Sequence, residues 1–356
     1  MAVATFEIGF TRFLDRSGEV VQPLPAFASE AKALIPLYRS MTRLRMFDAK
    51  AVALQRTGRL GTYAAALGEE AVTIGLASAM AADDVLVPAF RDQGAQLWRG
   101  VGLVDILAYW GGDERGSVAG PSEDFPVCVP IGTHFPHAVG VALAIKLRRQ
   151  SRAVVCIGGD GATSKGDVYE AMNMAGLWQL PVVFVVSNNQ WAISVPRQRQ
   201  TAAATLAQKA IAAGIPGEQV DGNDVIAVRH AVDEALAAAR AGRGPRLIEA
   251  VTYRLGDHTT SDDATRYRDD ATVSTHWAEE PLVRLRRYLT AQGVWTKEDE
   301  EAMQVALAAE IEKAVADYLA LPPPAPQDMF DHLFAVLPAD LKAQRDTLAE
   351  EEALHA

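Results

Sequence analysis

Apolar residues recur at helical spacing in the early part of the chain and form short, uninterrupted runs further along. Between residues 29 and 59 they lie three or four positions apart, which predicts a helix that Gly58 ends. A second helix is expected at 68–80, followed by a short strand at 85–87. The chain therefore begins to alternate helix and strand.

The middle of the chain carries the clearest pattern. Two continuous apolar runs, at 153–157 and 182–186, indicate strands buried on both faces. The elements expected around them are helices at 138–149, 167–178 and 225–241 and strands at about 215–220 and 246–253. The sequence predicts an α/β fold in which a doubly wound, mostly parallel sheet is flanked by helices.

The two ends of the chain differ from this middle region. Pro23, Pro25 and a lack of periodicity indicate an extended arm at the beginning. The polar stretch 257–275 also lacks periodicity and is too long for a routine connection, which is typical of functional loops. Helices are expected at 281–292 and 297–321, before a proline-rich break and a final amphipathic segment. The expected organisation is an arm (1–30), an α/β domain (31–275) and a helical extension (276–356) that packs on that domain or on a partner subunit.

Composition and charge narrow the class of protein. The 356 residues are 49% hydrophobic and 22% charged, as in a globular protein with a large core. A net charge of -11 argues against nucleic acid as a partner, because phosphate contacts need clustered Lys and Arg. No run approaches the roughly 18 apolar residues of a membrane span, and residues 1–15 lack a signal-peptide pattern. We expect a cytoplasmic protein with Cys128 and Cys156 reduced.

Polar residues follow three of the expected strands. Gly158 to Ala162 follows the first, Ser187 to Trp191 the second, and Arg254 to His258 the third. Parallel sheets bind ligands beyond the carboxyl ends of their strands. If the first two strands are neighbours, an Asp carboxylate and an Asn amide oxygen converge near a helix N-terminus. Such oxygen ligands and flanking glycines suit a magnesium-bound diphosphate.

Other readings of the glycine-rich turn fit less well. The dinucleotide fingerprint needs a third glycine where Ser164 stands, and a Walker P-loop needs a lysine where Asp167 follows Gly166. A turn whose Asp only caps a helix is the plain alternative. The 26 residues between Gly161 and Asn188 hold a helix and a strand, as a crossover requires, and favour the diphosphate site. A nicotinamide oxidoreductase and a scaffold without cofactor remain as alternatives from other classes.

Gly159-Asp-Gly161, followed at this distance by Asn188-Asn189, resembles the thiamine diphosphate motif. Together with Gly166 to Asn173, it resembles the α subunit of heterotetrameric 2-oxo acid dehydrogenases. The resemblance runs from about Tyr38 to beyond Leu341 and includes Gly68-Glu-Glu70, Phe90-Arg-Asp92, Val220 to Asp224 and His258 to Asp263. It implies an oxidoreductase that uses thiamine diphosphate and Mg²⁺.

The resemblance implies a role for each site residue. Asp160, the side chain of Asn189 and the backbone carbonyl of Trp191 would coordinate magnesium. Arg91 and Arg254 would contact the diphosphate, which suits forked donors that keep their charge. The other cofactor contacts would be Phe90, the Val129 carbonyl, Ile131 as a prop for the bent cofactor, Gly159, Gly161, Ala162, Ile193 and His258. His258 would also act in catalysis, by exchanging protons with the intermediate and the lipoyl group.

The chain departs from the family at four positions in or near this site. Phe90 and Trp191 replace tyrosines, and Ser187 stands where some members have a third phosphate-binding arginine, so we expect a lighter phosphate clamp. Thr259 replaces a serine that mitochondrial relatives phosphorylate, and we do not carry that regulation over.

The resemblance also implies that this chain holds half of an active site. The glutamate that activates the cofactor would come from a β subunit in an α2β2 heterotetramer, and the acyl group would pass to a lipoylated acyltransferase core. The segments 260–263, 281–288 and 329–341 favour a branched-chain substrate, 3-methyl-2-oxobutanoate. Pyruvate is the alternative among small 2-oxo acids.

Overall fold

The computed structural model describes residues 3–118, 120–121, 123–331 and 333–355. The chain divides into two compact units, Met1–Ala314 and Val315–Ala356, and the division falls within one long helix, α11 (Lys297–Leu319). The expected helical extension begins earlier, at residue 276. The first helix of that region, α10 (Pro281–Ala291), contributes Leu285 and Leu289 to the core of the first unit.

A six-stranded sheet forms the centre of the first unit, with the order β1-β7-β8-β4-β3-β2 and every neighbouring pair parallel. The strands are β1 (Phe10–Thr11), β2 (Val85–Val87), β3 (Val154–Gly159), β4 (Val182–Asn188), β7 (Gly217–Asp221) and β8 (Arg246–Val251). A small antiparallel pair, β5 (Trp191–Ala192) and β6 (Val195–Pro196), follows β4. The doubly wound α/β fold predicted from the sequence is confirmed.

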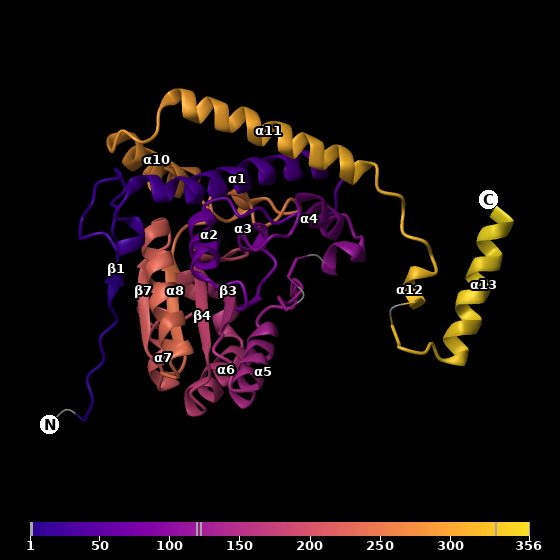
Figure 1. Cartoon of the computed structure of the whole chain (residues 1–356), viewed down its shortest axis with the longest axis horizontal. Coiled ribbons are helices and arrows are strands. Elements are labelled where there is room, and N and C mark those ends of the chain that lie inside the picture. The colour runs from indigo at the N-terminus through magenta and orange to yellow at the C-terminus, as the bar shows by residue number, and fades with distance from the viewer. Residues whose placement is uncertain (1–2, 119, 122, 332, 356) are drawn as a thin grey trace. The chain divides into compact units, whose positions relative to one another are not determined.

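Helices surround the strands (Figure 1). In the first unit they are α1 (Ile35–Arg56), α2 (Glu70–Ala79), α3 (Gln93–Trp98), α4 (Leu103–Trp110), α5 (His134–Leu147), α6 (Gly166–Leu177), α7 (Lys209–Ala212), α8 (Val225–Arg240), α9 (Asp270–Trp277) and α10. Most begin and end within a few residues of the positions expected from the sequence, while α3, α4, α7 and α9 were not anticipated.

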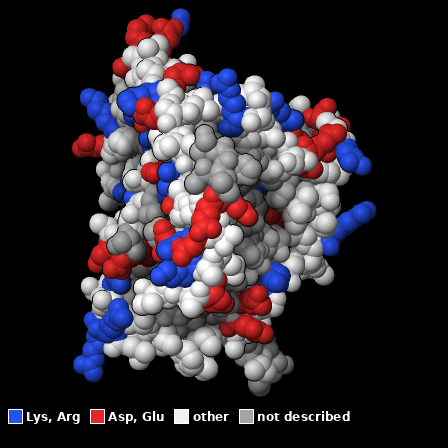
Figure 2. Space-filling view, turned by 90° about the vertical axis from the view of Figure 1, so that its right-hand side faces the viewer, with Lys and Arg blue, Asp and Glu red and all other residues white. Residues whose placement is uncertain are grey.

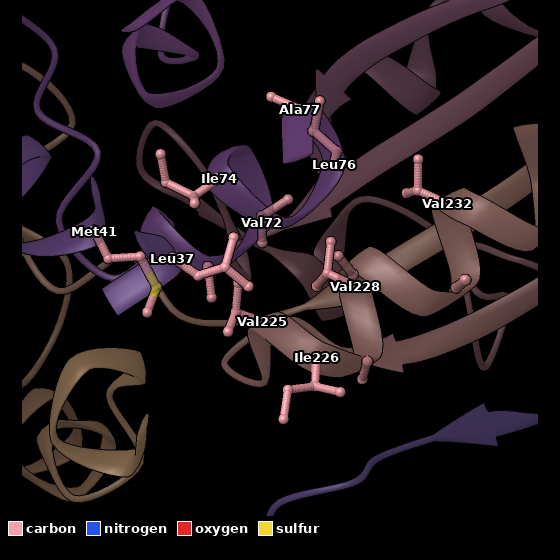
Figure 3. Close-up of a cluster of buried hydrophobic side chains, with 14 of the residues drawn as sticks. Leu37, Met41, Val72, Ile74, Leu76, Ala77, Val225, Ile226, Val228 and Val232 are labelled. Atoms are coloured by element: carbon pink, nitrogen blue, oxygen red, sulfur yellow. The ribbon is translucent and has the colours of Figure 1, made fainter. Parts of the chain in front are cut away.

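Two hydrophobic cores explain the continuous apolar strands. Val155 and Ile157 point into a core with α2 and α8, whereas Val154 and Cys156 point into a second core with α5 and α6. Because helices cover both faces of the sheet, each position of β3 is apolar. Figure 3 shows part of the first core, where Val72 and Ile74 of α2 lie opposite Val225 and Val228 of α8.

The N-terminal arm belongs to the sheet. Its strand β1 pairs with β7, so that Phe10 lies beside Gln219. The backbone N–H groups of Phe13 and Leu14 then donate to one carboxylate oxygen of Asp224, at 2.7 and 2.8 Å. The sequence predicted an extended arm, and the structure adds that this arm forms the sixth strand.

The expectation that residues 257–275 lack regular structure was wrong for the last residues of this stretch. Asp270 to Thr275 lie in α9, which begins after Asp269, whose side chain accepts from the backbone N–H of Ala271. No residue of α9 is buried, so the helix has no apolar face that a periodicity could reveal.

Besides the end of α11, the described residues of the second unit form two helices. They are α12 (Asp328–Asp331) and α13 (Ala339–His355), and Arg345 pairs with Asp331 at 3.4 Å. The segment around α12 exposes Met329, Leu333 and Val336.

Acidic and basic side chains lie interspersed over the face shown in Figure 2. Within the described residues, no helix combines the length and the apolar character that crossing a bilayer would require.

Candidate functional site

A cavity of about 280 Å³ brings together most of the predicted site residues. Those that line it are Phe90, Arg91, Ile131, Gly159, Asp160, Gly161, Ala162, Asn189, Trp191, Ile193 and His258. Val129 and Arg254 are not among its lining residues. Val129 is 55% exposed, and Arg254 is buried behind the wall, where it contacts the backbone carbonyls of Trp191 and Ile193.

The strand order creates this convergence. β3 and β4 are parallel neighbours with Gly159 beside Ser187, so Asp160 and Asn189 follow the ends of adjacent strands. β8 lies on the other side of β4, and the backbone N–H of Arg254 donates to the carbonyl of Asn189 at 3.1 Å. The condition for this convergence, that the first two strands are neighbours, is met.

Each of the three residues predicted to coordinate a metal already has a protein partner at a polar atom. One oxygen of Asp160, Oδ2, accepts from Nε2 of Gln200 at 2.5 Å. Asn189 donates from Nδ2 to Glu69 at 2.7 Å and accepts at Oδ1 from the backbone N–H of Trp191 at 3.1 Å. The Trp191 carbonyl accepts from Arg254 at 3.4 Å. In the described part of the chain, no cluster of three or more His, Cys, Asp or Glu side chains is arranged to hold a metal; the predicted set contains an amide and a carbonyl instead.

The charges of the cavity suit a divalent cation. Asp160 is 1% exposed, and burial raises its pKa to about 6, although the hydrogen bond from Gln200 opposes the shift. Glu69, also buried, adds a second carboxylate and pushes the pKa of Asp160 in the same upward direction. A hard cation beside Asp160 would offset this desolvation and repulsion. The residues therefore fit a magnesium ion with a diphosphate.

Two buried arginines border the site. The guanidinium of Arg91 donates to the carbonyls of Ala65, at 2.5 Å, and His258, at 2.7 Å. Arg254 donates to the carbonyl of Ile193 at 2.9 Å and to the hydroxyl of Tyr267 at 2.7 Å. These contacts hold one permanent positive charge in the wall of the cavity and a second one behind it, which suits an anionic ligand such as a diphosphate.

His258 lies between the two guanidinium groups. Its Nδ1 is 3.2 Å from a nitrogen of Arg91 and 3.2 Å from a nitrogen of Arg254. Because a guanidinium can only donate, Nδ1 must accept, which places the ring proton on Nε2. Burial, Arg91 and Arg254 together lower the pKa of His258 to about 4. The imidazole is therefore neutral at pH 7.

This arrangement predicts how His258 titrates in the cofactor-free protein. Its imidazole NMR signals should change with a midpoint near pH 4 rather than 6.5. The unfolded chain binds this proton at a higher pH than the folded protein does. The free energy of unfolding should therefore fall as the pH is lowered from 6.5 towards 4, because protonation of His258 favours the unfolded chain in this range. The His258→Gln variant should lose less free energy of unfolding between pH 6.5 and 4. A midpoint near 6.5 would show that the arginines do not face the ring.

Two polar residues in contact with the predicted ligands, the buried Glu69 and the partly buried Gln200, were not assigned a role from the sequence. Glu69 lies at the start of α2, where an acidic residue is ordinarily explained by the helix dipole. Gln200 lies in a polar loop after β6, where no pattern distinguishes it from its neighbours. Ser187, expected to leave a lighter phosphate clamp, donates its hydroxyl to Glu69 at 2.6 Å.

A wider cavity of about 750 Å³ shares Trp191 with this site and lies between the N-terminal arm and α9. Two of its arginines, Arg12 and Arg284, pair with the same carboxylate oxygen of Asp221 at 2.6 Å, so both guanidinium groups already have a partner within the protein.

Comparison with known proteins shows which family the chain resembles. The model of the family described as "Dehydrogenase E1 component" matches residues 38–327. The chain is 43% identical over 319 residues to a 3-methyl-2-oxobutanoate dehydrogenase subunit alpha of Mycobacterium tuberculosis, which covers 88% of this chain and 86% of the relative. It is 38% identical over 335 residues to a pyruvate dehydrogenase E1 component subunit alpha of Acholeplasma laidlawii, an alignment that covers 93% of this chain and 96% of the relative. A pyruvate dehydrogenase E1 component subunit alpha of Staphylococcus epidermidis is 37% identical over 346 residues, and this alignment covers 96% of this chain and 93% of the relative.

Proposed function

The chain belongs to the dehydrogenase E1 component family, and from this premise we propose that it is the α subunit of a 2-oxo acid dehydrogenase. It binds thiamine diphosphate through Mg²⁺ and acts in oxidative decarboxylation of a small 2-oxo acid. The acyl group passes to a lipoyl group on an acyltransferase core. The observation that carries this proposal is the cavity in which Asp160, Asn189 and Arg91 meet at the ends of adjacent parallel strands.

Each residue of the site has a distinct task. Asp160, Asn189 and the carbonyl of Trp191 would hold the cation, and Arg91 would contact the diphosphate. Arg254, which donates to the carbonyls of Trp191 and Ile193, would add its positive charge from behind the cavity wall. Thiamine diphosphate, when bound, supplies the electron sink that lets carbon dioxide leave the 2-oxo acid.

Two side chains of the cavity act on the reacting end. Ile131, 43% exposed, offers an apolar surface for the rings of the cofactor. His258 holds its proton at Nε2, as a group that donates a hydrogen bond in the reaction must.

The catalytic carboxylate comes from another chain. We propose an α2β2 heterotetramer in which a β subunit supplies the glutamate that activates the cofactor. Met329, Leu333 and Val336, exposed by the isolated chain, support a contact between the helical extension and that subunit.

The free thiols of Cys128 and Cys156 support a reducing, cytoplasmic compartment.

The requirement for a partner is tested by turnover. The purified chain, given thiamine diphosphate, Mg²⁺ and a 2-oxo acid, should release no carbon dioxide above background, and addition of the β subunit should restore the reaction. Appreciable thiamine-dependent turnover by the chain alone would contradict the proposal of a shared active site.

The substrate is proposed to be 3-methyl-2-oxobutanoate. Support comes from the higher identity to the relative of that name, 43% against 38% and 37% for the pyruvate dehydrogenase subunits. The reconstituted enzyme should show a larger kcat/KM for 3-methyl-2-oxobutanoate than for pyruvate by at least about tenfold, the discrimination that one or two methyl groups provide. A preference for pyruvate would favour the alternative, a pyruvate dehydrogenase α subunit.

A further inference from the structure

Asp160 begins a short 3-10 helix after β3 and Asn189 lies in the loop after β4. Each of these two proposed cation ligands contacts one polar side chain from another part of the chain. Asn189 contacts Glu69, which precedes α2 and is 120 residues away in sequence. Asp160 contacts Gln200, which is 40 residues away, in the loop between β6 and α7. Neither partner is among the metal ligands that the family resemblance implies.

Glu69 determines which way the Asn189 amide faces. One oxygen of Glu69 accepts from Asn189 Nδ2 at 2.7 Å, and the other accepts from the Ser187 hydroxyl at 2.6 Å. A carboxylate can only accept, so the NH₂ group of Asn189 must point to Glu69 and the oxygen Oδ1 must point away from it. The backbone N–H of Trp191, which donates to Oδ1 at 3.1 Å, favours the same orientation, so loss of Glu69 would leave this longer contact alone to keep the NH₂ group from turning towards a cation. Glu69 is 4% exposed and therefore keeps this contact out of water.

Gln200 acts on the carboxylate of Asp160 in a similar way. Its Nε2 donates to Asp160 Oδ2 at 2.5 Å and to the carbonyl of Val195 at 3.2 Å. The second oxygen of Asp160, Oδ1, is thereby left for another partner. The Oε1 atom of Gln200 is buried without a hydrogen-bond donor among the described residues. Such an unpaired acceptor costs free energy, and a water molecule carried by a cation would satisfy it.

We propose that Glu69 and Gln200 are positioning residues for the divalent cation: they orient the oxygens of Asn189 and Asp160 from behind, without being ligands themselves. This inference rests on the proposed function. Residues that orient metal ligands typically contribute about 10–100-fold to metal affinity. Their loss should therefore raise the Mg²⁺ requirement while leaving the ligand set intact.

The charge of Glu69 offers a competing explanation, because Glu69 also lies 3.4 Å from Nε of Arg91 and could act by its charge alone. Two replacements separate the explanations. Glu69→Asp keeps the charge but withdraws the carboxylate from Asn189 by one methylene group. Glu69→Gln keeps the length and removes the charge.

The experiment is a Mg²⁺ titration of the assembled α and β subunits. Binding of thiamine diphosphate is measured by calorimetry at increasing Mg²⁺, and kcat is measured in parallel. For Glu69→Asp and Gln200→Leu, the half-saturating Mg²⁺ concentration should rise about 10–100-fold, with kcat recovered at saturating Mg²⁺. The matched control is Gln198→Leu, in the turn just before Gln200, because Gln198 is exposed and should leave the titration unchanged.

The outcomes separate this inference from the proposed function. An unchanged Mg²⁺ requirement in Glu69→Asp and Gln200→Leu would overturn the inference, as would an effect confined to Glu69→Gln, which would point to charge alone. A low kcat that saturating Mg²⁺ does not restore would indicate a structural role and would also overturn it. If Asp160→Ala binds Mg²⁺ and cofactor normally in the same assay, the proposed function itself fails.

Discussion

Replacing Asp160 with alanine should abolish the Mg²⁺-dependent binding of thiamine diphosphate to the assembled protein. The other two proposed ligands, an amide oxygen and a backbone carbonyl, are neutral, so Asp160 supplies the only charged ligand of the set. Removing one partner of a buried charge pair costs about 2–5 kcal/mol, which corresponds to a loss of roughly 30-fold to several-thousand-fold in affinity. Glu69 does not compensate, because its oxygens are already bound to Asn189 and Ser187.

Calorimetric titration with thiamine diphosphate at several Mg²⁺ concentrations measures this effect. Asp167→Ala is a suitable control, since Asp167 lies on the same crossover, at the start of α6, and its side chain is 45% exposed. An Asp160→Ala protein with unchanged affinity would remove Asp160 from the metal site.

Replacing Arg45 with methionine should lower the free energy of unfolding by about 3–5 kcal/mol, because it leaves two buried carboxylates without their cation. Arg45, on α1, pairs with Glu70 at 2.7 Å and with Glu280 at 2.6 Å, and the side chains of these two partners are 0% and 3% exposed. Burial raises the pKa of Glu70, and Arg45 is the main group that opposes the rise. The three residues join α1, α2 and the start of α10.

Urea unfolding followed by circular dichroism measures the change, as a shift of the midpoint at constant slope. Arg43 provides the control on the same helix. It pairs with Glu310 at 2.5 Å, but these side chains are 25% and 40% exposed, so Arg43→Met should cost less than about 1 kcal/mol. Equal effects of the two replacements would mean that burial of the Arg45 network adds nothing to stability.

The sequence predicted the parts of the fold whose burial leaves a pattern. β4 was expected at 182–186 and spans Val182–Asn188, because each of its residues is buried. α9 was missed since it buries nothing, and β1 because a strand of two residues is too short to show a period. Local pattern therefore locates the buried strands, the edge strand β2 included, and misses elements that are very short or exposed.

The candidate site divides in a similar way. Asp160, Asn189 and Arg91 follow from short motifs at the expected strand ends and from the family resemblance. The roles of Glu69 and Gln200 depend on contacts with residues 120 and 40 positions away, which no local motif records. The low pKa of His258 also could not be predicted, since it requires two arginines that are distant in sequence from one another to face the same ring nitrogen.

The pairing of β1 with β7 affects how the chain can fold during synthesis. The first strand to leave the ribosome has its partner about 200 residues later, with Phe10 beside Gln219. The backbone N–H groups of Phe13 and Leu14 likewise cannot form their hydrogen bonds to Asp224 until that residue has been synthesised. A nascent chain therefore carries this segment unpaired until most of the sheet has been made, and closing so long a loop is slow. We expect attachment of the arm to be a late step in folding, one that seals the β7 edge against pairing with other chains.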